Sequence, residues 1–353
     1  MWSHGGRRVR LPSVSKRVLV VGGSGLVGEP IVRRLLETGA EVVVATRGNA
    51  TIAHDLATQV SAARIDRTVP GALEGVVGNG VDALVDVIPY RAADARQLLR
   101  LEGRMGTVVA ISSAAVYAGS DGRVLLEAGD SERPVPIPES HPTIPPDDQD
   151  YAGRKAAIEE LLLEQTAIPI TVLRPGAVYG VRDLASREWY FVKRVLDRRD
   201  KVVLAYEGAS RFHQVAAENV AELVRLALEK PGTRVLNAGD EEARTVTQIG
   251  RGVAALFKHQ WEEVLFSGPP TSEGVGDTPW TTPKPFVLDM SAAREELGYR
   301  GVVGYEEALR RTCEWLEREV DPANWQKALP KTAEYYGSLF GYEAEDEFIA
   351  RIE

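Results

Sequence analysis

Two side chains of opposite acid–base character stand four positions apart in a stretch with helical spacing. Tyr151 and Lys155 are separated by three residues, and this spacing puts both on one face of a helix. A free phenol has a pKa of about 10 and is a poor base at neutral pH, but a nearby cation favours the phenolate. Tyr151 could then exchange a proton with a hydroxyl or carbonyl group of a substrate. The pair alone is equally compatible with an ordinary solvated helix.

Two adjacent hydroxyl groups give this pair a partner. Ser112 and Ser113 directly follow the apolar run Thr107–Ile111, which predicts a strand. Ligands of open parallel α/β sheets bind at the carboxyl ends of the strands. Ser113 could therefore donate a hydrogen bond to a reacting oxygen, although either serine could instead cap a turn.

A glycine-rich turn supplies the second chemical feature. The sequence Gly-Gly-Ser-Gly-Leu-Val-Gly at 22–28 stands between a predicted strand at Arg17–Val21 and a predicted helix at Leu26–Thr38. In such a turn the first glycine permits a tight bend, a middle one lets the backbone approach a pyrophosphate, and the last one packs helix on strand. The free amides of the helix then face the phosphates. The predicted contacts of a dinucleotide are Gly22, Ser24, Gly25, Leu26, Val27 and Gly28.

The end of the second predicted strand bears on the choice of dinucleotide. An acidic residue about 20 positions after the turn would accept the ribose 2′-hydroxyl of NAD. Here the position carries Arg47, with no acid nearby, and a guanidinium pairs with the 2′-phosphate of NADP. The sequence therefore favours NADP, with NAD as the alternative. Asp66, after the third strand, is a candidate partner of the adenine amino group or, alternatively, a cap.

Alternating elements position these residues. Continuous apolar runs such as 18–21 are typical of strands covered on both faces by helices. We predict an α/β fold with a Rossmann-type, doubly wound parallel sheet. The predicted strands are Arg17–Val21, Glu41–Thr46, Ala62–Ile65, Ala83–Val87, Thr107–Ile111, Ile170–Arg174, Val202–Leu204, Arg234–Asn237 and Glu263–Phe266. The predicted helices are Leu26–Thr38, Val69–Val77, Ala92–Leu101, Tyr151–Glu164, Leu184–Asp197, Ala217–Glu229, Thr245–Phe257 and Val303–Glu319.

The domain organisation follows from where the alternation holds. We expect a flexible arm at 1–15, a nucleotide-binding domain at 16–177, a smaller substrate-binding lobe at 178–320 and a helical tail at 321–353. Part of 210–238 is expected to return to the first domain. The proline-rich stretch 120–150 is too long to be a plain loop and is expected to serve a site.

Composition limits the remaining function classes. The 353 residues are 44% apolar and 26% charged, with a net charge of −9, so a nucleic-acid partner is not expected. The one cysteine gives no internal disulfide. No run approaches the ~18 apolar residues of a membrane span. We expect a cytoplasmic protein without a membrane or metal site, and leave a homodimer open.

Taken together, these motifs resemble those of the extended short-chain dehydrogenase/reductases, the NAD(P)-dependent epimerase/dehydratase family. The matching segments, in family order, are 22–28, 112–117, 151–155, 174–180, 211–215 and 288–298. The resemblance implies that Ser113, Tyr151 and Lys155 are catalytic and that Lys155 also holds the nicotinamide ribose. It further implies that the backbone at Pro175 and Val178 contacts the cofactor and that Arg211 contacts a substrate phosphate. We add Ser112 as a predicted cofactor contact and Ala114, Tyr117 and His213 as predicted substrate contacts.

The chain also departs from the family pattern. The segment 90–106 is short, and Ala114-Ala115 replace the acidic pair of sugar dehydratases. The resemblance therefore implies an epimerase or oxidoreductase that acts on a secondary alcohol or ketone of a sugar nucleotide or sugar-like metabolite. The alternatives are a simple NADPH-dependent ketone reductase and a non-catalytic RNA-binding or regulatory protein of the same fold.

Overall fold

A seven-stranded parallel sheet forms the centre of the computed structural model, which describes residues 16–48, 52–122, 133–165 and 167–353. The predicted arm at 1–15 lies outside the described residues. The strands are β1 (Arg17–Val21), β2 (Glu41–Thr46), β3 (Ser61–Arg64), β4 (Ala83–Asp86), β5 (Val108–Ile111), β6 (Ile170–Pro175) and β10 (Arg234–Ala238). Their order in the sheet is β10-β6-β5-β4-β1-β2-β3. This order confirms the doubly wound prediction and places the switch of direction between β1 and β4.

Helices cover both faces of the sheet because every central strand is apolar on both sides. The helices of this layered part are α1 (Gly28–Glu37), α2 (His54–Ala57), α3 (Ala72–Val77), α4 (Ala92–Leu99), α5 (Tyr151–Glu164) and α7 (Ala217–Glu229). Val18 and Val20 of β1 pack with α1 and α7. Leu19 and Val21 face the other way and pack with α3, α4 and α5. The continuous apolar run of β1 thus reflects burial from two sides.

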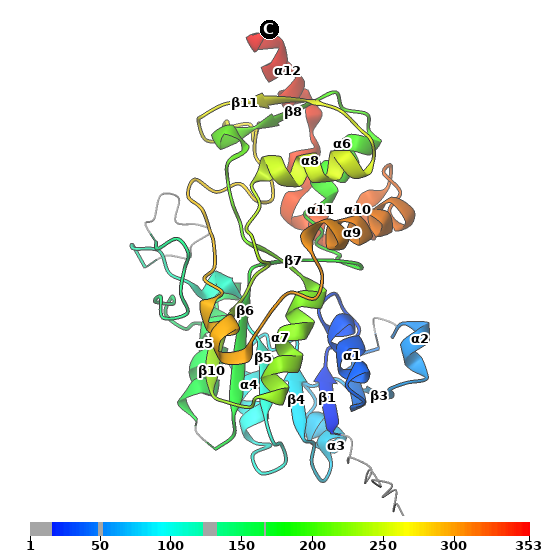
Figure 1. Ribbon diagram of the computed structural model, residues 1–353, viewed down its shortest axis with the longest axis vertical. Helices are drawn as coiled ribbons and strands as arrows, with labels where there is room; N and C mark the ends of the chain where they lie inside the picture. The colour runs from blue at the N-terminus through cyan, green and yellow to red at the C-terminus, as the bar shows by residue number, and fades with distance from the viewer. Residues whose placement is uncertain (1–15, 49–51, 123–132, 166) are drawn as a thin grey trace, which may run out of the picture.

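A second lobe stands above the carboxyl ends of these strands (Figure 1). Its helices are α6 (Trp189–Leu196), α8 (Val246–Leu256), α9 (Tyr305–Glu319), α10 (Trp325–Ala328), α11 (Pro330–Tyr336) and α12 (Tyr342–Ile352). Two small parallel sheets pair β7 (Ala177–Tyr179) with β9 (Gln214–Ala216) and β8 (Lys201–Leu204) with β11 (Glu262–Leu265). The core of this lobe is rich in aromatic residues, among them Trp189, Phe191 and Trp280.

Some helices and strands were not predicted, and one predicted helix begins later than expected. The four-residue α2 and the three-residue β7 and β9 were not expected. The predicted helix at Leu184–Asp197 begins only at Trp189, because the Asp183 carboxylate accepts the Ala185 amide at 2.8 Å and holds a turn. The segment around η3 (Ala293–Leu297) packs through Met290 and Leu297 into the core of the large sheet, far from the rest of its predicted lobe.

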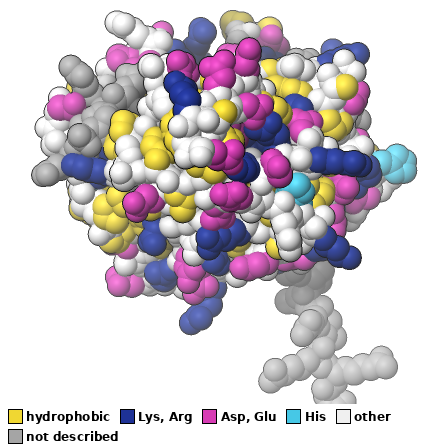
Figure 2. Space-filling view, turned by 90° about the horizontal axis from the view of Figure 1, so that it is seen from above, with side chains coloured by type: hydrophobic (Ala, Val, Ile, Leu, Met, Phe, Trp, Pro, Cys, Tyr) yellow, Lys and Arg dark blue, Asp and Glu magenta, His cyan; other side chains and the backbone are white. Residues whose placement is uncertain are grey.

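Three further observations concern the surface, the helices and the cysteine. On the face shown in Figure 2, acidic and basic side chains are interspersed rather than gathered by sign. Within the described ranges, no helix combines the length and apolarity that crossing a membrane would require. Cys313 is a buried free thiol in α9.

Candidate active site at the carboxyl edge of the sheet

The glycine turn between β1 and α1 has the geometry that a phosphate-binding turn needs. Gly22 has a φ of 89°, in the left-handed region that favours glycine. A Cβ at Gly28 would lie 2.1 Å from the Gly22 carbonyl oxygen, so only glycine fits where the helix meets the strand. A Cβ at Gly25 would meet nothing within 4 Å. The backbone at Gly25 is therefore open to an approaching ligand, while Ser24 is buried and Leu26 and Val27 are partly buried.

Two arginines lie together where β2 and β3 end. Arg47 is exposed directly after β2. The side chain of Arg64, the last residue of β3, lies against Gly48, and its Nε donates to the Arg47 carbonyl at 3.2 Å. Asp66 lies nearby, but its Oδ1 accepts both the amide and the hydroxyl of Thr68, at 2.9 and 2.6 Å. Asp66 therefore holds a local turn and is not a helix cap, because α3 begins at Ala72 with Gly71 as its N-cap. The hydrogen bonds from Thr68 lower the pKa of Asp66.

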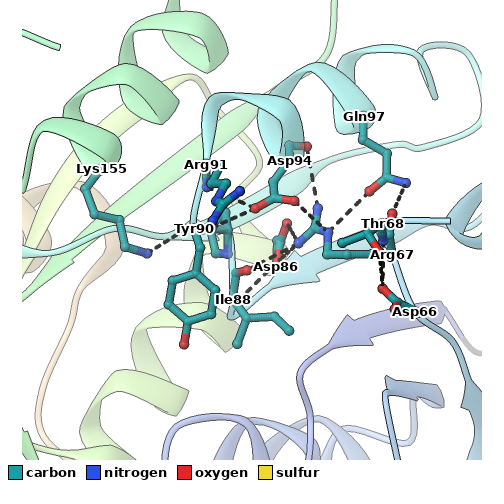
Figure 3. Close-up of polar contacts among 11 residues, drawn as sticks. Asp66, Arg67, Thr68, Asp86, Ile88, Tyr90, Arg91, Asp94, Gln97 and Lys155 are labelled. Carbon is teal, nitrogen blue, oxygen red and sulfur yellow. Dashed lines mark hydrogen bonds and ion pairs between the residues drawn. The ribbon is translucent and has the colours of Figure 1, made fainter. Parts of the chain in front are cut away.

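A buried ion-pair network lies between Asp66 and Lys155 (Figure 3). Asp86, the last residue of β4, is fully buried and lies 2.8 Å from Arg67 Nη1. Burial raises the pKa of Asp86 although the Arg67 charge opposes the rise. Asp94 pairs with Arg67 at 3.1 Å and accepts the Tyr90 amide at 2.8 Å. The network therefore fixes the loop 87–91 that leads away from β4.

This loop holds the side chain of Lys155. The Lys155 ammonium donates to the carbonyl oxygens of Pro89 at 2.8 Å and Ile111 at 2.9 Å. It also lies 5.4 Å from the centre of the Tyr90 ring and 5.7 Å from that of Tyr151. Burial lowers the pKa of Lys155 to about 8, although the neighbouring carboxylates Asp86, Glu159 and Asp94 oppose this.

Tyr151 is the first residue of α5, and its ring is 46% exposed. The helix begins here because the Asp150 side chain caps it by accepting the Gly153 amide at 2.7 Å. Loss of hydration raises the pKa of Tyr151, whereas a hydrogen bond with Ser113 and the charge of Arg187 lower it. Lys155, which the sequence predicted to lower this pKa, lies 5.7 Å from the centre of the Tyr151 ring. Ser113, Tyr151 and Lys155 therefore lie together at the carboxyl edge.

The two adjacent serines have different surroundings. The Ser113 Oγ accepts the Ala115 amide at 3.2 Å and lies beside Tyr151. The Ser112 hydroxyl is buried and donates to Glu159, whose carboxylate also pairs with Arg174 at 2.6 Å. The Ser112 side chain therefore faces the buried Glu159–Arg174 ion pair, whereas the Ser113 side chain faces Tyr151.

The other predicted contacts are buried or partly buried. Pro175 ends β6, and Val178 is a partly buried residue of β7. Ala114 is buried, and the buried Tyr117 hydroxyl donates to Asn237 at 2.6 Å. This hydrogen bond gives Tyr117 a structural role.

The two residues predicted near the substrate phosphate also differ. Arg211 is exposed, and its carbonyl accepts the Phe286 amide at 2.7 Å. His213 is 2% exposed; its Nδ1 accepts the Leu288 amide at 3.0 Å, and its Nε2 lies 3.0 Å from the Asp240 carbonyl. Burial lowers the pKa of His213 to about 4. The imidazole is therefore neutral and fully used inside the fold, out of reach of a substrate.

Sequence reasoning missed four side chains around this cleft: Arg64, Tyr90, Arg187 and Tyr335. Arg64 ends β3 and Tyr90 lies four residues after the end of β4, and these positions at the carboxyl edge of the sheet could have signalled them. Arg187 and Tyr335 carry no motif. Tyr90 is 54% exposed; burial of its hydroxyl raises its pKa, the Arg47 and Lys331 charges oppose the rise, and Tyr335 adds to it. The tail helix α11 thus faces the same cleft.

The residues present fit a nicotinamide dinucleotide. The turn at Gly22–Gly28 has no room for a side chain at Gly28, but it is open at Gly25. The guanidinium groups of Arg47 and Arg64 lie where β2 and β3 end. Ser113, Tyr151 and Lys155 lie near the end of β5. Among the described residues, no cluster of three or more histidine, cysteine or acidic side chains could hold a metal ion.

Two curated relatives are similar to this chain in sequence. A 2′-dehydrokanamycin reductase from Streptomyces kanamyceticus is 34% identical over 212 residues, which are 58% of this chain and 55% of that protein. The match thus spans only about half of the relative's length. A dTDP-6-deoxy-L-talose 4-dehydrogenase (NAD(P)(+)) from Kitasatospora kifunensis is 27% identical over 331 residues, 87% of this chain and 96% of that protein.

One solved structure and one family model are similar to this chain over much of its length. The UDP-glucuronic acid 4-epimerase of Bacillus cereus, in complex with UDP-glucuronic acid and NAD, has a TM-score of 0.66 at 19% identity, over 86% of this chain and 99% of that one. The model of the NAD dependent epimerase/dehydratase family matches residues 18–239. The chain therefore belongs to this family.

Proposed function

We propose that this enzyme is an NADP-dependent oxidoreductase that acts at a secondary alcohol or ketone carbon of a sugar nucleotide or sugar-like metabolite. The observation that carries the proposal is the meeting of Ser113, Tyr151 and Lys155 beside the glycine turn. Both curated relatives named above carry reductase or dehydrogenase names that refer to sugar-type compounds, which supports the same reaction class.

In the oxidising direction, the Tyr151 phenolate takes the proton of the substrate hydroxyl, and in the reducing direction the phenol returns it. Ser113 donates a hydrogen bond to the same oxygen and holds it beside Tyr151. The nicotinamide, when bound, supplies the hydride chemistry at the adjacent carbon. Lys155 has three donors, of which two are used by backbone carbonyls, so one is left for a ribose hydroxyl.

The preference for NADP rests on charge at the end of β2. Arg47 and Arg64 can both reach toward a 2′-phosphate, and the nearby Asp66 is engaged by Thr68. A planar guanidinium is well suited to phosphate oxygens. The other dinucleotide contacts are assigned to Gly22, Ser24, Gly25, Leu26, Val27, Gly28, Pro175 and Val178.

A redox-neutral epimerase is the second candidate. The segment 112–117 resembles that of epimerases, and the structural neighbour in complex with UDP-glucuronic acid is itself an epimerase. An epimerase returns the hydride to its substrate and consumes no cofactor, whereas a reductase or dehydrogenase converts one dinucleotide per product.

One experiment tests the assignment. NADP⁺ reduction is followed with dTDP-6-deoxy-L-talose and a panel of related sugars, for the wild type, Tyr151→Phe and the control Tyr299→Phe, whose buried hydroxyl has no hydrogen-bond partner among the described residues. Tyr151→Phe should bind dinucleotide normally and lose about 10²-fold or more in turnover, while the control keeps its rate. A Tyr151→Phe rate within a few-fold of wild type contradicts the proposal. Product formed without net cofactor conversion favours the epimerase.

A further inference from the structure

Arg67 is a buried arginine whose guanidinium is paired with two carboxylates from different elements. Its side chain is 9% exposed. Its Nη1 donates to both carboxylate oxygens of Asp86, the last residue of β4, at 3.0 and 2.8 Å. Its Nε lies 3.1 Å from Oδ1 of Asp94, a residue of α4. Because burying charges costs desolvation energy, such a network adds little net stability, and the groups that it fixes are more informative.

The two carboxylates also hold the backbone of the loop 87–91 on both sides of Pro89. The amides that they accept, at 2.8 to 3.1 Å, are those of Ile88, Tyr90 and Arg91. The Arg67 Nη1 itself donates to the Ile88 carbonyl at 3.4 Å. Pro89 has no amide hydrogen of its own, so its position depends on these neighbours. The loop is thus held in place by Arg67 and its two partners.

The Pro89 carbonyl is the point at which this network meets the catalytic group. It accepts a hydrogen bond from the Lys155 Nζ at 2.8 Å, and the Ile111 carbonyl accepts a second one at 2.9 Å. Figure 3 shows Lys155 and Arg67 on opposite sides of the loop. An ammonium group has three N–H donors, so two fixed acceptors set the direction of the third.

The turn around Arg67 does not need the guanidinium group. The Asp66 Oδ1 accepts the amide and the hydroxyl of Thr68 at 2.9 and 2.6 Å. The Gln97 Nε2 donates to the Arg67 carbonyl at 3.2 Å. These contacts use only the backbone of Arg67. A change of its side chain can therefore disturb the Lys155 end of the site without disturbing the Asp66 end.

We propose that Arg67 is a positioning residue for Lys155. Through its carboxylate partners and the loop 87–91, it holds the Pro89 carbonyl in place and so directs the free N–H of Lys155 toward the nicotinamide ribose. The proposal rests on the function proposed above, in which Lys155 binds that ribose, and deepens it by naming a residue that belongs to none of the motifs. Arg67 acts through Lys155, and a shift of about 1 Å in such a supporting group is enough to impair a site.

The test measures the affinity of the full chain for NADP⁺ and for its adenosine half, adenosine 2′,5′-bisphosphate, by isothermal titration calorimetry. NAD⁺ and ADP form the parallel pair without the 2′-phosphate. The single variants are Arg67→Met, Arg67→Lys and Lys155→Met, and the double variants are Arg67→Met/Lys155→Met and Arg67→Met/Asp86→Asn. The last one removes both charges, so that no unpaired carboxylate is left in the core. Arg96→Met, which changes an exposed arginine of α4, is the matched control.

Lys155→Met should weaken NADP⁺ binding about tenfold, because it removes a charge-assisted hydrogen bond, and should leave the affinity for adenosine 2′,5′-bisphosphate unchanged. Arg67→Met and Arg67→Met/Asp86→Asn should show the same selective loss, of several-fold. Arg67→Lys should recover part of it, since the charge returns without the planar fork. In the Lys155→Met background, Arg67→Met should change the NADP⁺ affinity by less than about twofold, because both substitutions remove the same contact.

Thermal unfolding of each variant confirms that the protein compared is folded. Equal losses for NADP⁺ and adenosine 2′,5′-bisphosphate in the Arg67 variants would indicate a general structural effect and overturn the proposal. Unchanged NADP⁺ affinity, or a full additional loss in the Lys155→Met background, would overturn it as well. If the wild type binds neither NADP⁺ nor NAD⁺, the proposed function is contradicted, and the role of Arg67 with it.

Discussion

The Lys155 ammonium lies 2.8 Å from the carbonyl oxygen of Pro89, a residue of the loop that leaves β4. With its second hydrogen bond, to the Ile111 carbonyl at the end of β5, this contact ties α5 to two adjacent strands. A backbone carbonyl is a weaker partner for a buried charge than a carboxylate. Burial therefore dominates and lowers the pKa of Lys155 to about 8.

This shift predicts a pH dependence of stability. Between pH 8 and the ordinary lysine value of 10.5, Lys155 is neutral in the folded chain and charged in the unfolded chain. The unfolded state then binds more protons, so rising pH stabilises the fold by up to about 1.4 kcal/mol per pH unit. Below pH 8 the cost of the buried charge is fully present. Denaturant unfolding of wild type and Lys155→Met at pH 7.5, 9 and 10 measures this difference; parallel pH curves for the two proteins would contradict it.

The glycine turn predicts opposite outcomes for two single-methyl substitutions. Gly28→Ala places its Cβ 2.1 Å from a carbonyl oxygen, so we expect a loss of stability of about 1–3 kcal/mol or more. Gly25→Ala meets nothing within 4 Å, so the fold should be unaffected. It should weaken dinucleotide binding by about tenfold, because the methyl group occupies space that a pyrophosphate needs. Unfolding curves and dinucleotide titrations separate the two effects. Normal cofactor affinity in Gly25→Ala would remove this turn from the binding site.

Cofactor preference should depend on both arginines at the end of β2. Wild type should bind NADP⁺ more tightly than NAD⁺, and Arg47→Asp should erase the difference by repulsion of the 2′-phosphate. Arg64→Met should reduce it by several-fold, since a charge-assisted hydrogen bond contributes about 1.5–3 kcal/mol at most. Arg100→Asp, an exposed change on α4, is the control and should leave the preference intact. Equal affinities in the wild type would refute the assignment.

The adjacent serines should separate catalysis from stability. Ser113→Ala should lower turnover by at least about tenfold with little change in unfolding. Ser112→Ala removes the donor to the buried Glu159 and should cost about 1–3 kcal/mol of stability with turnover nearly unchanged. Rates and urea unfolding of both variants decide the matter, and a loss of turnover only in Ser112→Ala would reverse the assignment.

The sequence predicted the layered fold because apolar runs and helical spacing are local patterns. β1, β2, α5 and α7 were bounded correctly for this reason. β7 and β9 are three residues each and exist only through their mutual pairing, which joins residues 177–179 to 214–216. No local pattern could announce them.

The same distinction applies to the site: groups of residues that are contiguous in sequence could be predicted, and contacts between distant residues could not. The glycine turn and the Tyr151–Lys155 pair are contiguous in sequence and could be found there. The different surroundings of Ser112 and Ser113 depend on Glu159, which lies far along the chain from both. His213 was predicted to contact the substrate, but its hydrogen bonds with Leu288 and Asp240 hold it in the interior.

The repeated passage of the chain between the two lobes restricts how the molecule can be divided or opened. After β6 the chain rises to α6 and β8, descends to α7 and β10, rises again to α8 and β11, and returns once more at η3 before α9 (Figure 1). A fragment that ends at residue 177 would leave the edge of β6 without β10, and unpaired edges promote aggregation. With so many connections, the lobes cannot swing apart about a single linker.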